Sequence, residues 1–312
     1  MSHTEPARLH ETLNAWNAGR LRPGVPHAGW RAALRRDARL LALEGEFVEA
    51  ERAAVAARAS LAPRDPAGFV AWFERLREDG PGQGDPLFPY LAARATREEL
   101  RWFLAQEVAG EAGFDDLVAL TQVKAPLRAK LELARNYWDE MGRGREEGMH
   151  GGMLEDLARE VGAASGAAPV VWESLALANL LVALASSRRY AHHALGALGA
   201  IELTAPTRAV HVVAALRRVG VSREGTRYFA LHATLDVKHS EAWNREVFGP
   251  IVAADPSVAP YLAEGALMRL AAGARCFERY RRELGAGAAP SQPSRSSRAR
   301  SSRVNRSPTS VR

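Results

Sequence analysis

Stretches in which apolar residues recur every three or four positions run through the sequence to about residue 284, and they constrain the fold more than any other feature. They are rich in Ala, Leu, Arg and Glu, which favour the α-helix. No stretch alternates apolar and polar residues between turn signals, as a half-buried strand does. The sequence therefore predicts an all-α bundle, with helices at about residues 28–60, 65–79, 96–122, 127–142, 151–162, 169–186, 188–203, 205–218, 222–247 and 257–284.

Clusters of Pro and Gly lie between the predicted helices, and the clearest of them is DGPGQGDPLFP at residues 79–89. Such clusters mark turns and loops, because Pro lacks an amide donor and Gly tolerates turn conformations. We predict that this cluster separates an N-terminal helical section, residues 1–89, from a main helical domain, residues 90–285.

The last segment, residues 286–312, is rich in Ser, Arg, Pro and Gly and has few apolar residues. It is predicted to be disordered, because it cannot bury enough surface to offset its ordering entropy. The formal net charge of the chain is +6. That whole excess equals the number of arginines in this segment: Arg295, Arg298, Arg300, Arg303, Arg306 and Arg312. Nucleic acid is therefore not expected as a partner of the folded part, and only weak contact through the tail is compatible with the charge.

No apolar run approaches the roughly 18 residues that span a bilayer, and the first residues show no secretory signal. Cys276 is the only cysteine, so no disulfide can form within the chain. We expect a soluble cytoplasmic protein without a membrane contact, in which Cys276 is a packing residue.

The segment GTRYFALHATLDVKHSEAW contains three potential metal ligands on one helical face. His232, Asp236 and His239 stand at i, i+4 and i+7, so they share one stripe over about two turns. The flanking members of that stripe are aromatic: Tyr228, Phe229 and Trp243. A carboxylate and two imidazoles on an inward face are costly unless they are paired or bind a metal. This combination suits iron, manganese or zinc better than magnesium or calcium.

Other predicted helices carry further donors that a bundle could direct at the same centre. Each alone is more often a surface charge, but together they favour a metal site. Glu107 shares a stripe with Phe103, Gly110 and Phe114, while Glu111, one turn on, is its rival. The remaining donors are Glu140 beside Tyr137, His150 after a Gly-rich connection, and Glu202 near the end of a helix of small residues.

The segments FLAQE, NYWDEMGRG, GALGAIE and YFALHATLDVKH, with His150 between them, resemble the haem-oxygenase-like dimetal oxidases and oxygenases. These are iron-containing redox enzymes, and the resemblance covers about residues 90–285. It implies a haem-oxygenase-like multi-helix bundle that holds two irons. It also implies dioxygen as co-substrate, for N-oxygenation, desaturation or oxidative C–C cleavage of a small organic substrate. The ligand set that it implies is Glu107, Glu140, His150, Glu202, His232, Asp236 and His239. Glu202 would complete the site when metal or dioxygen binds.

Several alternatives stay open. Glu111 could replace Glu107 as a ligand, and Glu147, three residues before His150, could replace Glu140. True haem oxygenases bind haem through one axial histidine, and thiaminase-like relatives use a cysteine nucleophile, so neither explains this donor set. The alternative function is a non-catalytic metal-binding or regulatory helical protein. A homodimer is compatible with the sequence.

Overall fold

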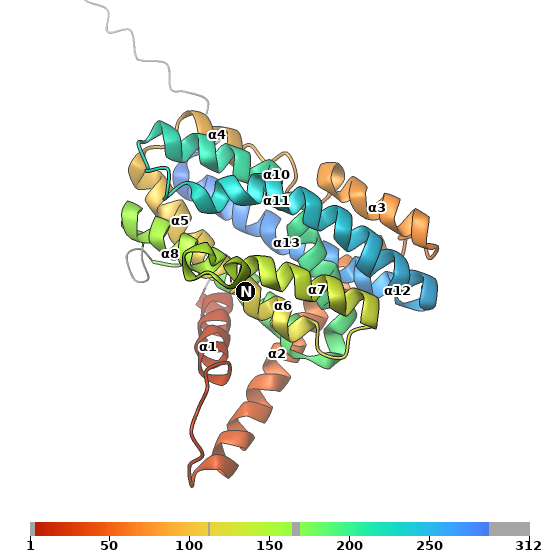
Figure 1. Cartoon of the computed structure of the whole chain (residues 1–312). Helices are drawn as coiled ribbons and strands as arrows, with labels where there is room; N and C mark the ends of the chain where they lie inside the picture. Colours follow the sequence, from red (N-terminus) through yellow and green to blue (C-terminus); the bar gives the residue numbers. More distant parts are fainter. Residues whose placement is uncertain (1–3, 112, 164–168, 287–312) are drawn as a thin grey trace, which may run out of the picture.

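The computed structural model describes residues 4–111, 113–163 and 169–286, and within these ranges the chain folds into helices without a strand (Figure 1). Their order confirms the predicted all-α bundle. The α-helices are α1 (Thr4–Arg20), α2 (Trp30–Ala59), α3 (Pro66–Asp79), α4 (Leu87–Ala93), α5 (Arg97–Glu111), α6 (Phe114–Thr121), α7 (Leu127–Glu140), α8 (His150–Val161), α9 (Trp172–Ser186), α10 (Ala191–Arg218), α11 (Arg227–Trp243), α12 (Gly249–Ala254) and α13 (Ala259–Leu284). Short helices η1 (Gly142–Gly144) and η2 (Glu146–Gly148) connect α7 to α8, and the π-helix η4 (Asn244–Phe248) joins α11 to α12.

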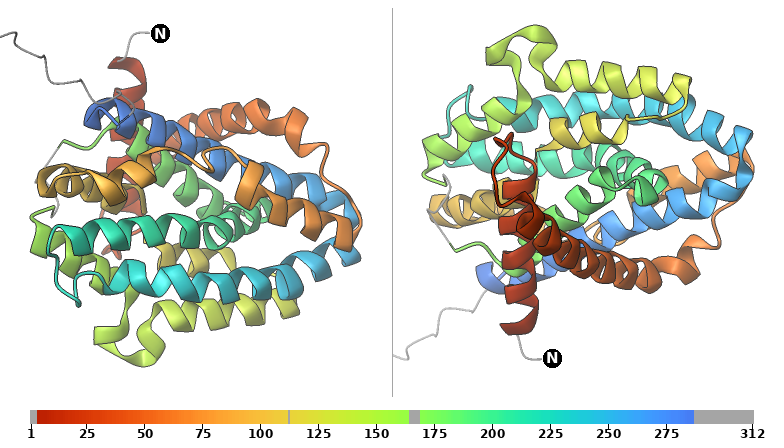
Figure 2. Two further views of the ribbon diagram at one scale, coloured as in Figure 1. Left: turned by 90° about the horizontal axis from the view of Figure 1, so that it is seen from above. Right: turned by 90° about the horizontal axis from the view of Figure 1, so that it is seen from below.

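The centre of the bundle is formed by α9 and α10. Every residue of α9 from Glu173 to Ala185 is buried, as its almost wholly apolar sequence leads one to expect. Helix α10 packs against α9, α11 and α13, and α10 and α11 run alongside each other in Figure 2. Of the candidate donors, Glu202 lies on α10 itself, and His232, Asp236 and His239 lie on α11, which packs against it.

Helices α10 and α13 approach each other at two glycines. A Cβ atom on Gly196 would lie 1.9 Å from the backbone oxygen of Leu262, and one on Gly265 would lie 2.0 Å from that of His193. Real Cβ atoms do not approach backbone this closely, so both positions require glycine. The two glycines fix how α10 and α13 lie against each other.

Three local differences from the predicted helices have clear physical causes. Helix α1 was not predicted, because its apolar residues are few and it is held by packing on α9. The predicted helix at 96–122 is two helices, and α6 begins after Gly113, whose φ of +71° interrupts a helix. Conversely, α10 continues through Pro206, where a break was expected. Packing against α4, α9, α11 and α13 supports α10 across the proline.

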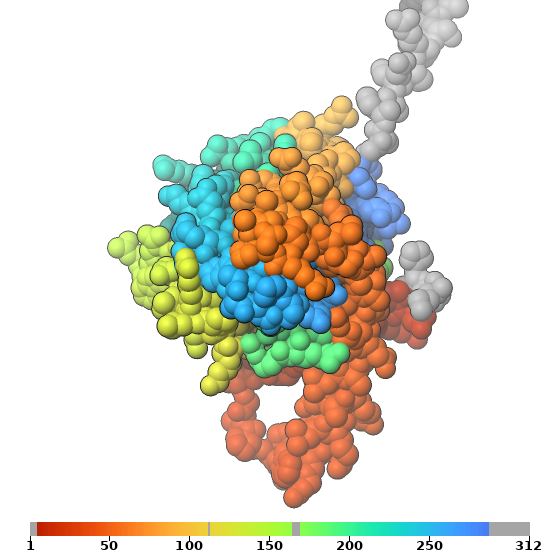
Figure 3. Space-filling model, turned by 90° about the vertical axis from the view of Figure 1, so that its right-hand side faces the viewer, coloured from red at the N-terminus to blue at the C-terminus, as the bar shows by residue number. Residues whose placement is uncertain are grey.

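The N-terminal section is joined to the bundle by buried contacts. Helix α1 packs on α9 and α2 packs on α13. The buried side chain of Asn17 donates to Asn179 of α9 at 2.9 Å. The end of α1, its connection and the first turns of α2 project from the bundle, and Trp30 and Leu34 are exposed there (Figure 3). The division of the chain near residue 90 stays a prediction.

The predicted disordered tail, residues 286–312, lies outside the described residues except for Ala286. Among the helices that are described, none has the length and apolar character that crossing a bilayer requires.

Candidate metal centre

Three of the predicted ligands lie on α11 and face the interior. Asp236 is 2% exposed and His239 is 7% exposed, while His232 is partly buried. The stripe of i, i+4 and i+7 positions is continuous because α11 is a regular helix from Arg227 to Trp243. Helix α11 packs against α7, α8 and α10, which carry the other donors of the centre.

A tight connection brings the end of α7 beside the start of α8. Gly142 has a φ of +61°, and a Cβ on it would lie 2.3 Å from the carbonyl carbon of Gly148. Only residues without a side chain allow the two segments to approach this closely. The residue after Glu140 and the residue before His150 form an isolated antiparallel bridge. The chain therefore folds back on itself, and the last residue of α7, Glu140, meets the first residue of α8, His150.

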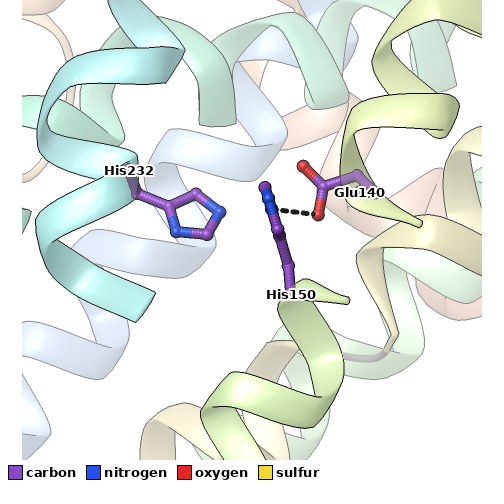
Figure 4. Close-up of side chains that lie close together, drawn as sticks. All are labelled: Glu140, His150 and His232. Atoms are coloured by element: carbon purple, nitrogen blue, oxygen red, sulfur yellow. Dashed lines mark ion pairs between the residues drawn. The ribbon is translucent and has the colours of Figure 1, made fainter. Parts of the chain in front are cut away.

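Glu140, His150 and His232 form the first group of donors, and Figure 4 shows their side chains converging from three helices. Nδ1 of His150 lies 2.8 Å from Oε2 of Glu140, yet it is buried and makes no hydrogen bond of acceptable geometry. Nδ1 of His232 lies 2.8 Å from the carbonyl oxygen of Tyr228. A carbonyl can only accept, so this nitrogen carries the proton and leaves the Nε2 lone pair free. Nδ1 of His150 and Nε2 of His232 are therefore both available to a common ion.

Glu202, Asp236 and His239 form the second group, from α10 and α11, with all three side chains buried. Oε2 of Glu202 lies 3.4 Å from Nδ1 of His239. Its other oxygen, Oε1, accepts a hydrogen bond of 2.6 Å from the amide of Asn136 on α7. The carboxylate is thus oriented with one oxygen held by the protein and the other directed at the imidazole.

Asp139 of α7 supports the second group from behind. Its Oδ2 lies 3.2 Å from Nε2 of His239, the nitrogen on the far side of the ring from Glu202. A carboxylate in this position fixes the tautomer of a metal-binding histidine and raises its basicity. Burial alone would raise the pKa of Asp139, but hydrogen bonds with Arg143 and His239 lower it. Asp139 is therefore an anion held against His239.

The electrostatics of the two groups reflect several acids crowded into an apolar interior. Burial, reinforced by the charge of Glu202, raises the pKa of Glu140 to about 8. Burial also raises the pKa of Asp236 well above its usual value and lowers that of His150 to about 4. For His239, burial alone would lower the pKa, but hydrogen bonds with Glu202 and Asp139 raise it to about 9. Divalent cations would relieve this crowding, because they attract the carboxylates that otherwise repel one another.

The alternative ligands Glu107, Glu111 and Glu147 lie outside both donor groups. Neither Glu107 nor Glu111 of α5 belongs to either group, although both line the adjoining cavity. Burial and the charge of Glu140 raise the pKa of Glu111 to about 7. Burial raises the pKa of Glu107, while the charges of Arg208 and Arg269 act to lower it. Glu147 is exposed in η2, and it is Glu140 that lies beside His150. The ligand assignment itself stays a prediction.

An internal cavity of about 130 Å³ adjoins both groups. Its wall includes Glu140, Glu202, His232 and Asp236, so the donors open directly into it. Most of the remaining wall is apolar, for example Phe88, Leu154, Leu177, Leu181, Val212 and Phe229. A small apolar cavity with a few polar groups at one place is the usual form of a site for a small molecule.

Four residues of the site were not found from the sequence. Asp139 falls on a charged stripe of α7 that looks exposed, and only the arrangement of α7 against α11 reveals its contact with His239. Asn136 offered no signal, because a single amide is common on helix surfaces. Arg208 and Arg269 line the cavity, and the signal for Arg269 was present: it interrupts the apolar run GALMRLAAGA in α13.

A bundle whose core helices direct two sets of carboxylate and imidazole donors into one apolar cavity defines a class of helical metalloproteins. Comparison with protein families identifies the family within this class. A family model described as iron-containing redox enzyme matches residues 101–274, more than half of the chain. The chain belongs to this family, whose fold is haem-oxygenase-like.

Solved structures include a protein of the same fold. The crystal structure of a CADD-like protein of unknown function from Nostoc punctiforme matches with a TM-score of 0.55 and 20% sequence identity. The match covers 69% of this chain and 96% of that one. At this identity the likeness concerns the fold alone, and it supports the predicted haem-oxygenase-like bundle. A search of curated proteins gives no match.

Proposed function

We propose that this protein is a non-haem diiron oxidase or oxygenase that uses dioxygen to oxidise a small organic substrate. The observation that carries the proposal is the pair of donor groups, Glu140–His150–His232 and Glu202–Asp236–His239, opening into one cavity. Membership of the iron-containing redox enzyme family supports iron as the metal. N-oxygenation, desaturation and oxidative C–C cleavage are the reaction types that the resemblance in sequence suggests.

The residues fit a pair of iron ions. Each group combines carboxylate and imidazole, which iron accepts together. The buried Nδ1 of His150 has no hydrogen-bond partner among the described residues, and the free Nε2 of His232 is in the same group. A metal would satisfy both nitrogens. Three protein ligands for each ion leave room for further ligands, as catalytic metal sites require.

The residues around the groups prepare them for the chemistry that bound ferrous iron supplies, which is the reduction of dioxygen. Tyr228 holds His232 in the tautomer that leaves Nε2 free, and Asp139 anchors His239. Asn136 holds one oxygen of Glu202 and leaves the other turned toward His239. Many of the side chains that line the cavity are apolar, which limits the water around a bound substrate.

The proposal is tested by adding iron(II) to the metal-free protein in the absence of air and then admitting dioxygen. We expect about two irons per chain, since each group supplies enough ligands for one open site. We also expect consumption of dioxygen that depends on the bound iron. Binding of iron without dioxygen consumption would favour the non-catalytic metal-binding protein, and tight binding of one haem in its place would contradict the diiron site.

Replacing Asp139 by asparagine is expected to weaken iron binding by roughly 10- to 100-fold at one of the two sites. The amide keeps the size of the side chain but loses the charge that orients His239. The first group does not contact Asp139, so its affinity should be unchanged, and an isothermal titration with iron(II) resolves the two steps. Asp156→Asn is the matched control, because Asp156 pairs with Arg159 on the surface of α8 at 2.6 Å, away from both groups. Equal weakening of both steps would show that Asp139 acts only on the stability of the fold.

A further inference from the structure

Two arginines line the cavity that the metal centre opens into. Arg208 comes from α10 and Arg269 from α13, and Glu107 of α5 lies in the same wall. None of these three residues belongs to either donor group. An arginine remains protonated even in an apolar environment, so its charge must be offset by something nearby.

Arg269 lacks the partners that a buried guanidinium requires. Its Nε and Nη1 atoms are buried and have no hydrogen-bond partner among the described residues. Among the described residues, no carboxylate forms an ion pair with Arg269. Space is nevertheless made for the group, because a Cβ on Gly273 would lie 2.7 Å from Nη1. Buried donors without partners are unfavourable, so their presence calls for a ligand that satisfies them.

Arg208 adds a second positive charge beside the first. Its Nη2 donates to Oγ1 of Thr204 at 3.2 Å, and its guanidinium carbon lies 5.4 Å from the centre of the Phe277 ring. Burial, followed by the charge of Arg269, lowers the pKa of Arg208 to about 10. Glu107 is the one acid that acts on both arginines, and burial raises its own pKa. Asp236 also acts on Arg208, but among the described residues no acid forms an ion pair with either arginine.

The remaining wall decides what kind of anion fits. Around the arginines the cavity is lined by apolar side chains, including Phe88, Val212 and Phe277. These would desolvate a hydrated, doubly charged phosphate at high cost, whereas an organic acid with one charge brings its own apolar body. Carboxylates also match the planar guanidinium group in hydrogen-bond geometry.

We propose that the cavity binds a small organic acid, with its carboxylate on Arg269 and Arg208 and its apolar body against the wall shared with the metal centre. The carboxylate accepts hydrogen bonds from the unpartnered N–H groups of Arg269 and forms the ion pair that this guanidinium lacks. That this acid is the molecule oxidised rests on the proposed function. The binding itself does not, because neither arginine belongs to a donor group.

The test is to titrate the full-length protein with phenylacetate and hexanoate, with and without bound iron(II), in the absence of air. Each acid is compared with the alcohol and the amine of matching length: 2-phenylethanol, 1-hexanol, 2-phenylethylamine and hexylamine. We expect at least one acid to bind roughly 10- to 100-fold more tightly than its alcohol, as loss of a charge-assisted hydrogen bond implies. The amines should bind more weakly still. If neither acid exceeds its alcohol, the inference is wrong.

Variants locate the carboxylate. Arg269→Gln should remove the advantage of the acid over the alcohol while leaving the affinity for the alcohol unchanged. Arg279→Gln, on the same helix but paired with Glu283 at 2.8 Å, should change neither affinity. Should Arg269→Gln fail to fold, Gly273→Ala provides the second variant, because its methyl group displaces the guanidinium, and it should weaken binding of the acid selectively. An equal loss in Arg279→Gln, or no loss in either cavity variant, would overturn the assignment.

The outcomes for this inference and for the proposed function are separable. Binding of the acid by a protein that takes up no iron would overturn the diiron proposal and leave the acid site standing. Iron-dependent dioxygen consumption in a protein that does not discriminate acid from alcohol would overturn the acid site and leave the diiron proposal standing.

Discussion

Replacing His232 by alanine is expected to lower the iron content from about two ions per chain to about one and to abolish dioxygen consumption. His232 belongs to the first donor group, and Asp236, one turn further along α11, belongs to the second. Asp236→Ala should therefore cost the other ion with the same loss of turnover. Iron content, the rate of dioxygen consumption and the melting temperature of each variant provide the measurement.

The matched control is His193→Ala. His193 is also a buried histidine beside a carboxylate, with Nε2 2.8 Å from Oε2 of Glu264, but it lies outside both groups. Its loss should lower the melting temperature, since Glu264 loses a buried partner, while iron content stays at the wild-type value. Wild-type iron content in both His232→Ala and Asp236→Ala would mean that α11 carries no metal site.

Replacing Gly196 by alanine is expected to destabilise the protein by about 3 kcal/mol, near the upper end for an overpacked core. The added methyl carbon would lie 1.9 Å from the backbone oxygen of Leu262, so α10 and α13 must separate. A loss of this size lowers the melting temperature of a domain this large by about 6–10 °C. Thermal unfolding followed by circular dichroism gives the measurement.

Gly45→Ala serves as the opposite case on α2. No atom lies within 4 Å of the Cβ position at Gly45, so the substitution introduces no clash. Alanine should stabilise the helix there by about 0.5–1 kcal/mol, because glycine loses more backbone entropy on folding. If both substitutions changed the stability equally, the crossing of α10 and α13 would not be the close contact that the structure describes.

The features predicted from the sequence were those encoded within single helices. The helical class and the shared stripe of His232, Asp236 and His239 follow from the 3.6-residue period, which needs no knowledge of tertiary structure. The interruption at Gly113 was missed although glycine is a local signal for the end of a helix. The continuity of α10 through Pro206 was missed because it depends on how neighbouring helices pack.

The contacts between side chains of different helices could not be predicted from periodicity. Glu140 and His150 meet because Gly142 and Gly148 allow the connection to close. The Gly-rich sequence between them did not by itself predict this contact. Asp139 and His239 are 100 positions apart in the chain, and no local sequence pattern indicates their contact. The resemblance to a known family, rather than any spacing, was what joined donors from five helices into one expected centre.

Helix α13 contributes Arg269 to the cavity wall but no donor to either metal group. Mutations along α13 can thus change which molecules enter the cavity while every candidate ligand remains as it was. Helix α10, by contrast, carries both the candidate ligand Glu202 and the cavity residue Arg208. If the proposed function is correct, substitutions confined to α13 would change the substrate without removing a metal ligand.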